Sequence, residues 1–146
     1  MADMINKDLD RAKTLLEFEG YTCVLCRDDK VYVSTKRGVS PLLEWLESSI
    51  DMKGFSAADK VIGKAAAFLF VLAGIREVYA PVISTAAMGV FEQCGIKAVC
   101  DLMPDRIVNR AGTGLCPMET AVWDIEEPET ALKVIKSTVK KMQQLN

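Results

Sequence analysis

Two lysines and an aspartate stand at the start of the most apolar segment of the chain. The sequence DKVIGK at positions 59–64 leads into AAAFLFVLAG, and this pattern predicts one buried helix over residues 59–74. Lys60 and Lys64 are then one turn apart on one face. Their charge opposes the helix dipole, so Asp59 can satisfy one lysine while the other meets an anionic ligand. The alternative is a buried helix whose lysines only reach out to solvent.

Cys116 is the candidate nucleophile of the sequence. It precedes Pro117-Met118-Glu119, and proline followed by glutamate in the first turn is typical of a helix start. A cysteine at a helix N-terminus has a stabilised thiolate. If this protein is an enzyme, we predict acyl or amidine transfer or hydrolysis through Cys116, with Lys60 or Lys64 stabilising developing negative charge. The alternatives are a small buried cysteine beside a turn and a glutamate that only favours its helix start.

Polar residues in three further places complete the predicted ligand site. Arg37-Gly38 follows a predicted hairpin, and Asn109-Arg110 precedes a glycine-bearing loop. Each arginine offers a fork-shaped donor for a carboxylate or phosphate, and each is equally suited to carbonyls or surface carboxylates. Ser84 starts another predicted helix, where it serves as a cap or as a ligand contact. The ligand predicted from these residues, together with Asp59 and Glu119, is a small anionic or nucleotide-like molecule.

Histidine is absent from all 146 residues. This absence excludes Ser-His-Asp and Cys-His catalysis and every histidine-containing zinc site. The only close cysteine pair, Cys23 and Cys26, lies in a predicted strand, where positions three apart point to opposite faces and cannot readily share a metal. We therefore predict no metal site and no cofactor, with both cysteines in the core.

Charge and hydropathy limit the partners of the chain. The net charge of −2 gives no electrostatic case for binding nucleic acid or a membrane surface. No stretch reaches the ~20 apolar residues of a membrane span, and the first ten residues lack an apolar signal region. Five cysteines without a secretory context fit reduced thiols. We expect a cytoplasmic protein, and assembly into a homo-oligomer is left open.

The periodicity predicts one α/β domain over residues 1–146. A mixed sheet with helices on both faces, a three-layer α-β-α sandwich, follows from a hairpin succeeded by alternating helices and strands. In such sheets ligands gather where parallel strands end and helices begin. Beside the segment 59–74, the predicted helices cover 4–19, a stretch from Pro41 with Ser40 as its N-cap, one capped by Ser84 or Thr85 that stops before Gly95, one from Pro117 and 128–142. The predicted strands cover 21–26, 30–34, 76–83, 97–102 and 106–108.

This order of elements resembles the cytidine deaminase-like superfamily, most closely over residues 58–100. In that superfamily a His-x-Glu motif and a Pro-Cys-x-x-Cys motif begin two helices and hold zinc. Here the first motif falls at residues 61–63 and the second at 83–87, with Ser84 and Ala87 in place of the cysteines. The resemblance therefore implies the fold without the zinc chemistry.

More narrowly, the chain resembles a small prokaryotic family of unknown function assigned to that superfamily. The shared strings are CVLC, STKRGVSPLLEWL, ADKVIGKAAAFL, VIS, IVNR and GLCPME, over roughly residues 20–120. The resemblance implies a fold and the location of a pocket. It supplies no reaction, so an enzyme acting through Cys116 and a non-catalytic ligand-sensing or interaction module that uses the same pocket both remain open.

Overall fold

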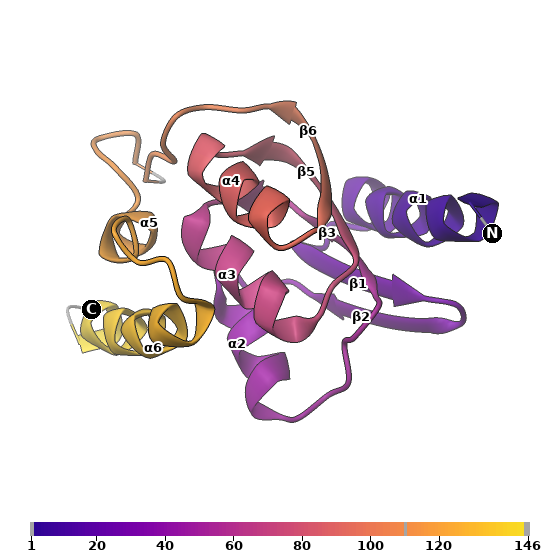
Figure 1. Ribbon diagram of the computed structural model, residues 1–146, viewed down its shortest axis with the longest axis horizontal. Helices are drawn as coiled ribbons and strands as arrows, with labels where there is room; N and C mark the ends of the chain where they lie inside the picture. Colours follow the sequence, from indigo (N-terminus) through magenta and orange to yellow (C-terminus); the bar gives the residue numbers. More distant parts are fainter. Residues whose placement is uncertain (1, 110, 145–146) are drawn as a thin grey trace.

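The computed structural model describes residues 2–109 and 111–144, which form one six-stranded mixed sheet with helices on both faces (Figure 1). The three-layer α-β-α arrangement predicted from the sequence is confirmed. The elements in chain order are α1 (Ala2–Phe18), β1 (Cys23–Arg27), β2 (Lys30–Ser34), α2 (Ser40–Glu47), β3 (Ser56–Asp59), β4 (Val61–Ile62), α3 (Lys64–Ala73), β5 (Glu77–Ile83), α4 (Thr85–Gln93), β6 (Lys97–Leu102), α5 (Pro117–Ala121) and α6 (Pro128–Gln144).

The sheet is antiparallel on one side and parallel on the other. β1 pairs antiparallel with β2 and β3, whereas β3, β4 and β6 all run parallel to β5. Ser56 pairs with Glu77 and Val61 with Val82, so both pairings have the same offset of 21 residues. β3 and β4 therefore follow one another along the same edge of β5 in one register. The ladder is interrupted at Pro81, whose nitrogen has no hydrogen to donate.

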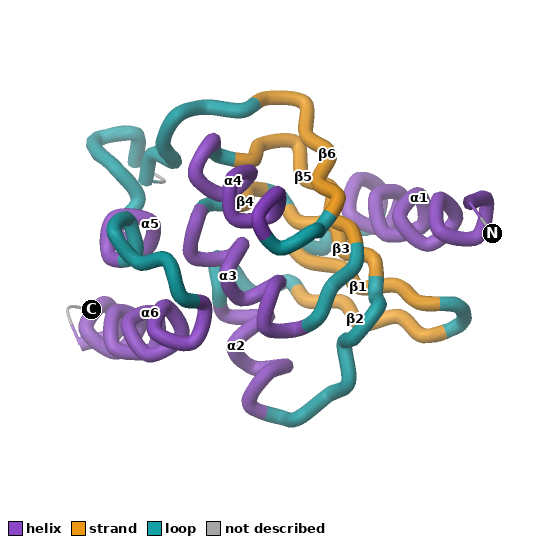
Figure 2. The backbone as a smooth tube through the Cα atoms, in the orientation of Figure 1, coloured by secondary structure: helices purple, strands orange, loops and turns teal. Residues whose placement is uncertain are grey.

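The two faces of the sheet are covered unequally. α1 alone packs on one face, against β1, β3 and β5. On the other face lie α2, α3 and α4, and α6 packs against the outer side of α3. Figure 2 shows this order, with α1 to the right of the strands and the remaining helices to the left. Cys23 belongs to the core beneath α3 and Cys26 to the small core beneath α1, so the prediction that the two thiols point to opposite faces is confirmed.

The helix predicted over residues 59–74 is real but begins later. Residues 56–59 form β3, residues 61–62 form β4, Gly63 is the N-cap, and the helical residues run from Lys64 to Ala73. The β-branched pair Val61-Ile62 continues the parallel ladder with β5, and this pairing prevails over the helical pattern. Lys60 is therefore outside the helix. The prediction that Lys60 and Lys64 share a helix face was wrong.

The body of α3 is as buried as its composition predicted. Phe68, Leu69 and Phe70 are each at most 1% exposed.

Two smaller predictions about the elements need correction. α2 begins at Ser40 itself, with Val39 as an N-cap that makes no side-chain bond. The short strand expected at residues 106–108 is only an isolated bridge between Val108 and Leu115. Among the described residues, no helix is long and apolar enough to cross a membrane.

Candidate functional site

Two helices begin side by side at the carboxyl ends of neighbouring parallel strands. β4 ends at Ile62 and leads through Gly63 into α3, while β5 ends at Ile83 and leads through Ser84 into α4. The predicted capping role of Ser84 is confirmed, because its hydroxyl accepts a hydrogen bond of 3.1 Å from the amide of Ala87. The amide of Lys64, at the start of α3, and the hydroxyl of Ser84, at the start of α4, lie at one point of the sheet edge.

The carboxylate of Glu119 occupies this point. Its Oε2 accepts hydrogen bonds from the backbone amide of Lys64 at 2.8 Å and from the hydroxyl of Ser84 at 2.6 Å. Its Oε1 accepts one from the amide of Ile107 at 2.8 Å. Glu119 is only 1% exposed, so these three donors replace the water that a surface carboxylate would bind. We call Glu119, Ser84, Ile107 and the amide of Lys64 the Glu119 site.

The absence of a side chain at Gly63 makes room for this carboxylate. A Cβ atom at position 63 would lie 3.1 Å from Oε2 of Glu119 and 3.2 Å from Cγ1 of Ile107. The φ angle of Gly63 is −95°, so glycine is needed here for space and not for its conformational freedom. The first turn of α3 is thus open to a carboxylate group that approaches it closely.

Neither lysine predicted for the site donates from its ammonium group to Glu119 in the described part of the chain. Lys64 donates from Nζ to the carbonyl of Trp123 at 2.6 Å, and the same nitrogen lies 5.6 Å from the ring centre of Phe68. Lys60 is exposed, and its backbone amide donates to Oδ1 of Asp59 at 2.7 Å. Lys64 therefore contributes to the Glu119 site through its backbone amide, while its side chain holds the chain after α5.

The segment that carries Glu119 is fastened at several points. The guanidinium of Arg106 lies 3.7 Å from the ring centre of Trp123 and donates to the hydroxyl of Thr120 at 3.2 Å. The amide of Cys116 donates to the carbonyl of Ile107 at 2.8 Å. We call residues 103–123 the bridging segment, because it runs from the end of β6 to the chain beyond α5 and places Glu119 against the helix starts.

Cys116 is the N-cap of α5, as predicted, and is partly exposed. Its amide is bonded to the same residue, Ile107, whose own amide is bonded to Glu119. No hydrogen bond among the described residues joins the thiol of Cys116 to Lys60 or Lys64. The predicted approach of thiol and lysine remains a prediction.

Asp59 forms a second buried carboxyl group, separate from the Glu119 site. It is 7% exposed and pairs across the antiparallel ladder with Cys23. Burial raises the pKa of Asp59 from 3.8 to about 8, and the backbone amide of Lys60 and the thiol of Cys23 only partly oppose this effect. Burial, reinforced by the neighbouring Asp59, also raises the pKa of Cys23 well above its usual value.

The remaining predicted ligand residues lie outside the hydrogen bonds of the Glu119 site. Arg37 and Gly38 are exposed in the turn before α2. Asn109 stabilises its own loop, with its side chain bonded to the amide of Thr113 at 3.0 Å and to the hydroxyl of Thr113 at 3.1 Å. Arg110 lies outside the described residues. Whether these residues contact a ligand remains a prediction.

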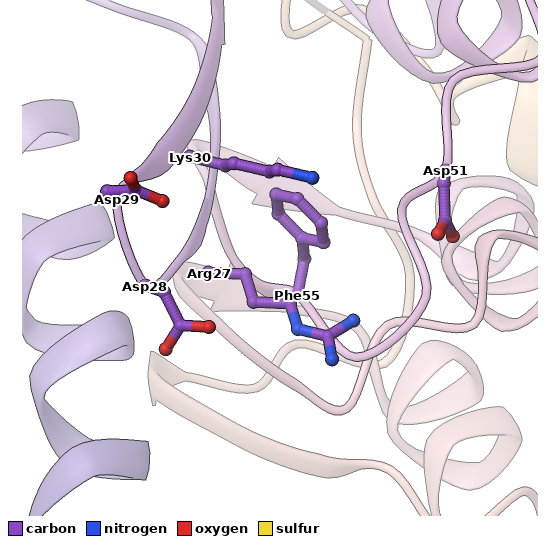
Figure 3. A pocket seen from close by; sticks show the side chains of 6 residues that line it. All are labelled: Arg27, Asp28, Asp29, Lys30, Asp51 and Phe55. Atoms are coloured by element: carbon purple, nitrogen blue, oxygen red, sulfur yellow. The ribbon is translucent and has the colours of Figure 1, made fainter.

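Neither of the two best-formed pockets lies at the Glu119 site. One, of about 320 Å³, lies beside the turn between β1 and β2, where Lys30 and Arg27 extend past the ring of Phe55 (Figure 3). Three aspartates complete its walls, so its charges are mixed, and Arg27 already donates to the carbonyl of Lys53 at 2.5 Å. The other, of about 370 Å³, is an open groove between β2 and α2. The buried hydrogen bonds of Glu119 are the stronger sign of a site, because the first pocket has mixed charges and the second is an open groove.

No group of three or more cysteine, aspartate and glutamate side chains is placed to hold a metal ion within residues 2–109 and 111–144. Three residues of the Glu119 site, Ser84, Glu119 and Lys64, were predicted, although Lys64 was expected to act through its ammonium group and not through its backbone amide. Ile107 was missed, since an apolar residue that acts through its backbone amide leaves no signal in the sequence. The fastening role of Trp123 was missed for the same reason, because it accepts from Lys64 through its carbonyl.

Comparisons with known proteins place the chain in a family and support the fold. The model of the DUF1893 family, described as a domain of unknown function, matches residues 11–139. The crystal structure of a DUF1893 family protein from Thermotoga maritima superimposes with a TM-score of 0.79 at 23% identity, covering 92% of this chain and 90% of that one. At that identity the likeness concerns the fold.

A more distant similarity involves an enzyme from the same organism. It is a diaminohydroxyphosphoribosylaminopyrimidine deaminase/5-amino-6-(5-phosphoribosylamino)uracil reductase, with a TM-score of 0.44 and 12% identity over 82% of this chain and 41% of that one. This similarity is too weak to bear on activity. No curated protein sequence matches the chain.

Proposed function

The chain belongs to the DUF1893 family, a domain of unknown function, and we propose that it is a non-catalytic module that senses a small anionic molecule. The ligand carries a carboxylate or phosphate group and binds at the starts of α3 and α4. Its anion takes the place of the Glu119 carboxylate. Binding therefore releases the bridging segment from the helix starts, and this release is the signal.

The donors around Glu119 are the observation that carries this proposal. Two backbone amides and one hydroxyl converge on a single carboxylate, and two of these three donors stand at helix starts. Amides at a helix N-terminus bind anions of any origin, because they combine unpaired N–H groups with the positive end of the helix dipole. An external carboxylate offers the same two acceptor oxygens as Glu119 and competes for the same donors.

The contacts of the bridging segment support its role as the part that responds. The carbonyl of Trp123 accepts from Lys64, and the indole ring of the same residue stacks with Arg106. Both contacts are exposed side-chain contacts of modest strength. Displacement of Glu119 removes the buried anchor from this segment, so the environment of the Trp123 indole changes with it.

Tryptophan fluorescence tests this proposal directly. The chain has two tryptophans, so Trp45→Phe leaves Trp123 as the sole reporter. Titration of this variant with sodium acetate or inorganic phosphate, at ionic strength held constant with sodium chloride, should give a saturable change in emission. The matched variant Trp123→Phe, which reports from Trp45, should show none. If acetate and phosphate act no differently from chloride, the sensing proposal is wrong.

Chemical rescue tests whether the donors accept an external anion. Glu119→Ala removes the carboxylate and leaves a cavity beside Gly63, which acetate or formate can fill. We expect the melting temperature of this variant to rise saturably with acetate, while Glu126→Ala, which changes an exposed glutamate, shows no such rise. Failure of rescue in a folded Glu119→Ala variant would mean that the donors are closed to ligands.

A catalytic version of the same site is favoured by the position of Cys116. This cysteine and Glu119 are both anchored to Ile107, and the thiol is partly exposed, unlike the buried thiols of Cys23 and Cys26. An activated ester such as p-nitrophenyl acetate should then acylate the protein once per chain. Cys116→Ser should abolish this step, and Cys94→Ser, at an exposed cysteine, should not. Equal labelling of the two variants would leave only the sensing module.

A further inference from the structure

One edge of the sheet is open along β6. β6 pairs with β5 on its inner side, and no further backbone hydrogen bond involves its six residues in the described part of the chain. Figure 2 shows β6 at the border of the sheet, with the following loop leading away from it. The outer N–H and C=O groups of such a strand are free to pair with another strand.

The side chains on one face of β6 are also uncovered. Lys97, Val99 and Asp101 alternate along the strand and share the α1 side, where Val99 stands beside Tyr79. α1 packs over β1, β3 and β5, and Val99 remains 41% exposed. Beyond the strand end, Leu102 and Met103 are 66% and 53% exposed. This edge therefore combines free backbone groups, an apolar centre and one charge of each sign.

We propose that β6 is the interface between two copies of this chain. β6 of each copy pairs antiparallel with β6 of the other about a two-fold axis at Val99. In this register Lys97 lies opposite the partner's Asp101, Val99 opposite the partner's Val99, and Ala98 opposite the partner's Cys100. Because the axis is two-fold, the Lys97–Asp101 pair occurs twice, and directly opposed charges of opposite sign stabilise strand pairing.

Two alternative pairings, one with a shifted axis along β6 and one between two copies of β2, are less complementary in charge. A two-fold axis at Cys100 would place Val99 opposite Asp101 and leave Lys97 without an acidic partner. The opposite border strand, β2, also exposes two valines, Val31 and Val33. Self-pairing of β2 about Tyr32 would oppose Lys30 to Ser34, with no pair of opposite charges. Charge complementarity therefore selects β6, with the axis at Val99.

Sedimentation velocity of the full chain tests the interface through a charge swap. The wild-type chain should sediment as a dimer of twice 16.1 kDa. Lys97→Asp sets two aspartates against each other at both ends of the interface and should raise the dimer dissociation constant roughly tenfold. The double variant Lys97→Asp/Asp101→Lys restores opposite charges and should return the constant close to that of the wild type. Val33→Lys, the matched change on β2, should have no effect.

A second substitution separates an effect on the dimer from an effect on the folding of the monomer. Asp101 accepts a hydrogen bond of 2.9 Å from the Tyr79 hydroxyl, so changing it disturbs the monomer as well. Val99→Lys leaves that bond in place and brings two ammonium groups together at the axis, and it should also dissociate the dimer. A wild-type chain that stays monomeric up to about 0.1 mM, or a dimer that Lys97→Asp and Val99→Lys leave intact, would overturn the proposal. A dimer broken only by Val33→Lys would assign the interface to β2.

Discussion

Glu119 and Asp59 are both buried acidic residues, but they differ in the hydrogen bonds that their carboxyl groups accept. Glu119 lies where two helices begin and accepts three hydrogen bonds from three separate parts of the chain. Asp59 lies at the end of β3 beside the thiol of Cys23, and its main donor is the amide of the next residue. Burial therefore governs Asp59 and raises its pKa to about 8.

This difference shows what a helix start contributes to a buried acid. Strand amides are already used by the ladder, so a carboxyl group among strands finds few donors, whereas the first turn of a helix has unpaired amides to offer. A buried carboxylate at a helix start is thus compensated for its lost water, and one between strands is not. The comparison favours the Glu119 site as the position for the proposed anionic ligand and gives Asp59 a pH-dependent cost in stability.

The largest effect on stability should follow from removing the carboxylate of Glu119, whose lost water is replaced by three hydrogen bonds. Glu119→Ala leaves three buried donors without an acceptor and detaches the bridging segment, so we expect a loss of about 4 kcal/mol in the free energy of unfolding. Chemical denaturation measures this loss, and Glu126→Ala should change stability by less than about 0.5 kcal/mol. A loss below 1 kcal/mol for Glu119→Ala would show that the three hydrogen bonds contribute little.

Asp59→Asn should stabilise the protein, and only at higher pH. The folded protein holds a proton on Asp59 that the unfolded chain releases, since the pKa is 3.8 in an ordinary environment and about 8 here. The wild type therefore loses stability as the pH rises from about 4 to about 8, and the loss is complete above that range. Each pKa unit corresponds to about 1.4 kcal/mol. Because the buried amide keeps part of the desolvation cost, we expect an advantage of about 3 kcal/mol at pH 9.

Denaturation of Asp59→Asn and wild type at pH 5 and pH 9 measures this dependence. Asp105→Asn, which changes an exposed aspartate, is the matched control and should follow the wild-type curve at both values. A constant difference between Asp59→Asn and the wild type across this range would contradict the raised pKa of Asp59.

Gly63→Ala should have an intermediate effect at the Glu119 site. The added methyl group meets Oε2 of Glu119 at 3.1 Å, so the carboxylate must retreat from the amide of Lys64. We expect a loss of about 1–2 kcal/mol. Gly89→Ala in α4 is the control with the opposite sign, because its Cβ meets nothing within 4 Å and alanine favours the helix by about 0.5–1 kcal/mol. If both variants gain stability, Gly63 is not there to admit a carboxylate.

The smallest effect should come from the lysine side chains. Lys64→Ala keeps the backbone amide that binds Glu119 and removes the bond to the carbonyl of Trp123 and the contact with the Phe68 ring. We expect a loss below about 1 kcal/mol, together with a shift in Trp123 emission. Lys60→Ala should alter neither property. A loss from Lys64→Ala as large as that from Glu119→Ala would mean that the ammonium group, and not the amide, sustains the site.

The sequence predicted the sheet better than it predicted the site. The strands predicted over residues 30–34 and 97–102 are β2 and β6, and their observed bounds are the predicted ones. Residues 59–63 were misassigned to α3, because their apolar side chains fit a buried helix as well as a buried strand, and only the pairing with β5 decides between them. The local sequence pattern is thus sufficient to predict an element only where neighbouring residues in the chain determine its structure.

The site depended on contacts that no local pattern contains. Ser84 and Glu119 were predicted because caps and first-turn acids have sequence signatures. Glu119 lies 55 residues beyond Lys64 in the chain. That it caps α3 instead of its own α5 therefore depends on the path of the bridging segment. The position of the Glu119 carboxylate also depends on Ile107, which donates from its backbone amide. Every residue except proline has such an amide, so the sequence does not single out Ile107.

The unequal covering of the sheet has a consequence for how the molecule opens. Among the side chains that the structure describes, the core beneath α1 holds six buried residues, including Ala12 and Leu16 of the helix itself, whereas the core on the other face unites α2, α3, α4 and α6. A layer with so little buried apolar surface detaches at a lower free energy than global unfolding. Amide hydrogen exchange should therefore find α1 opening as a unit of its own, while α3 exchanges only when the whole chain unfolds.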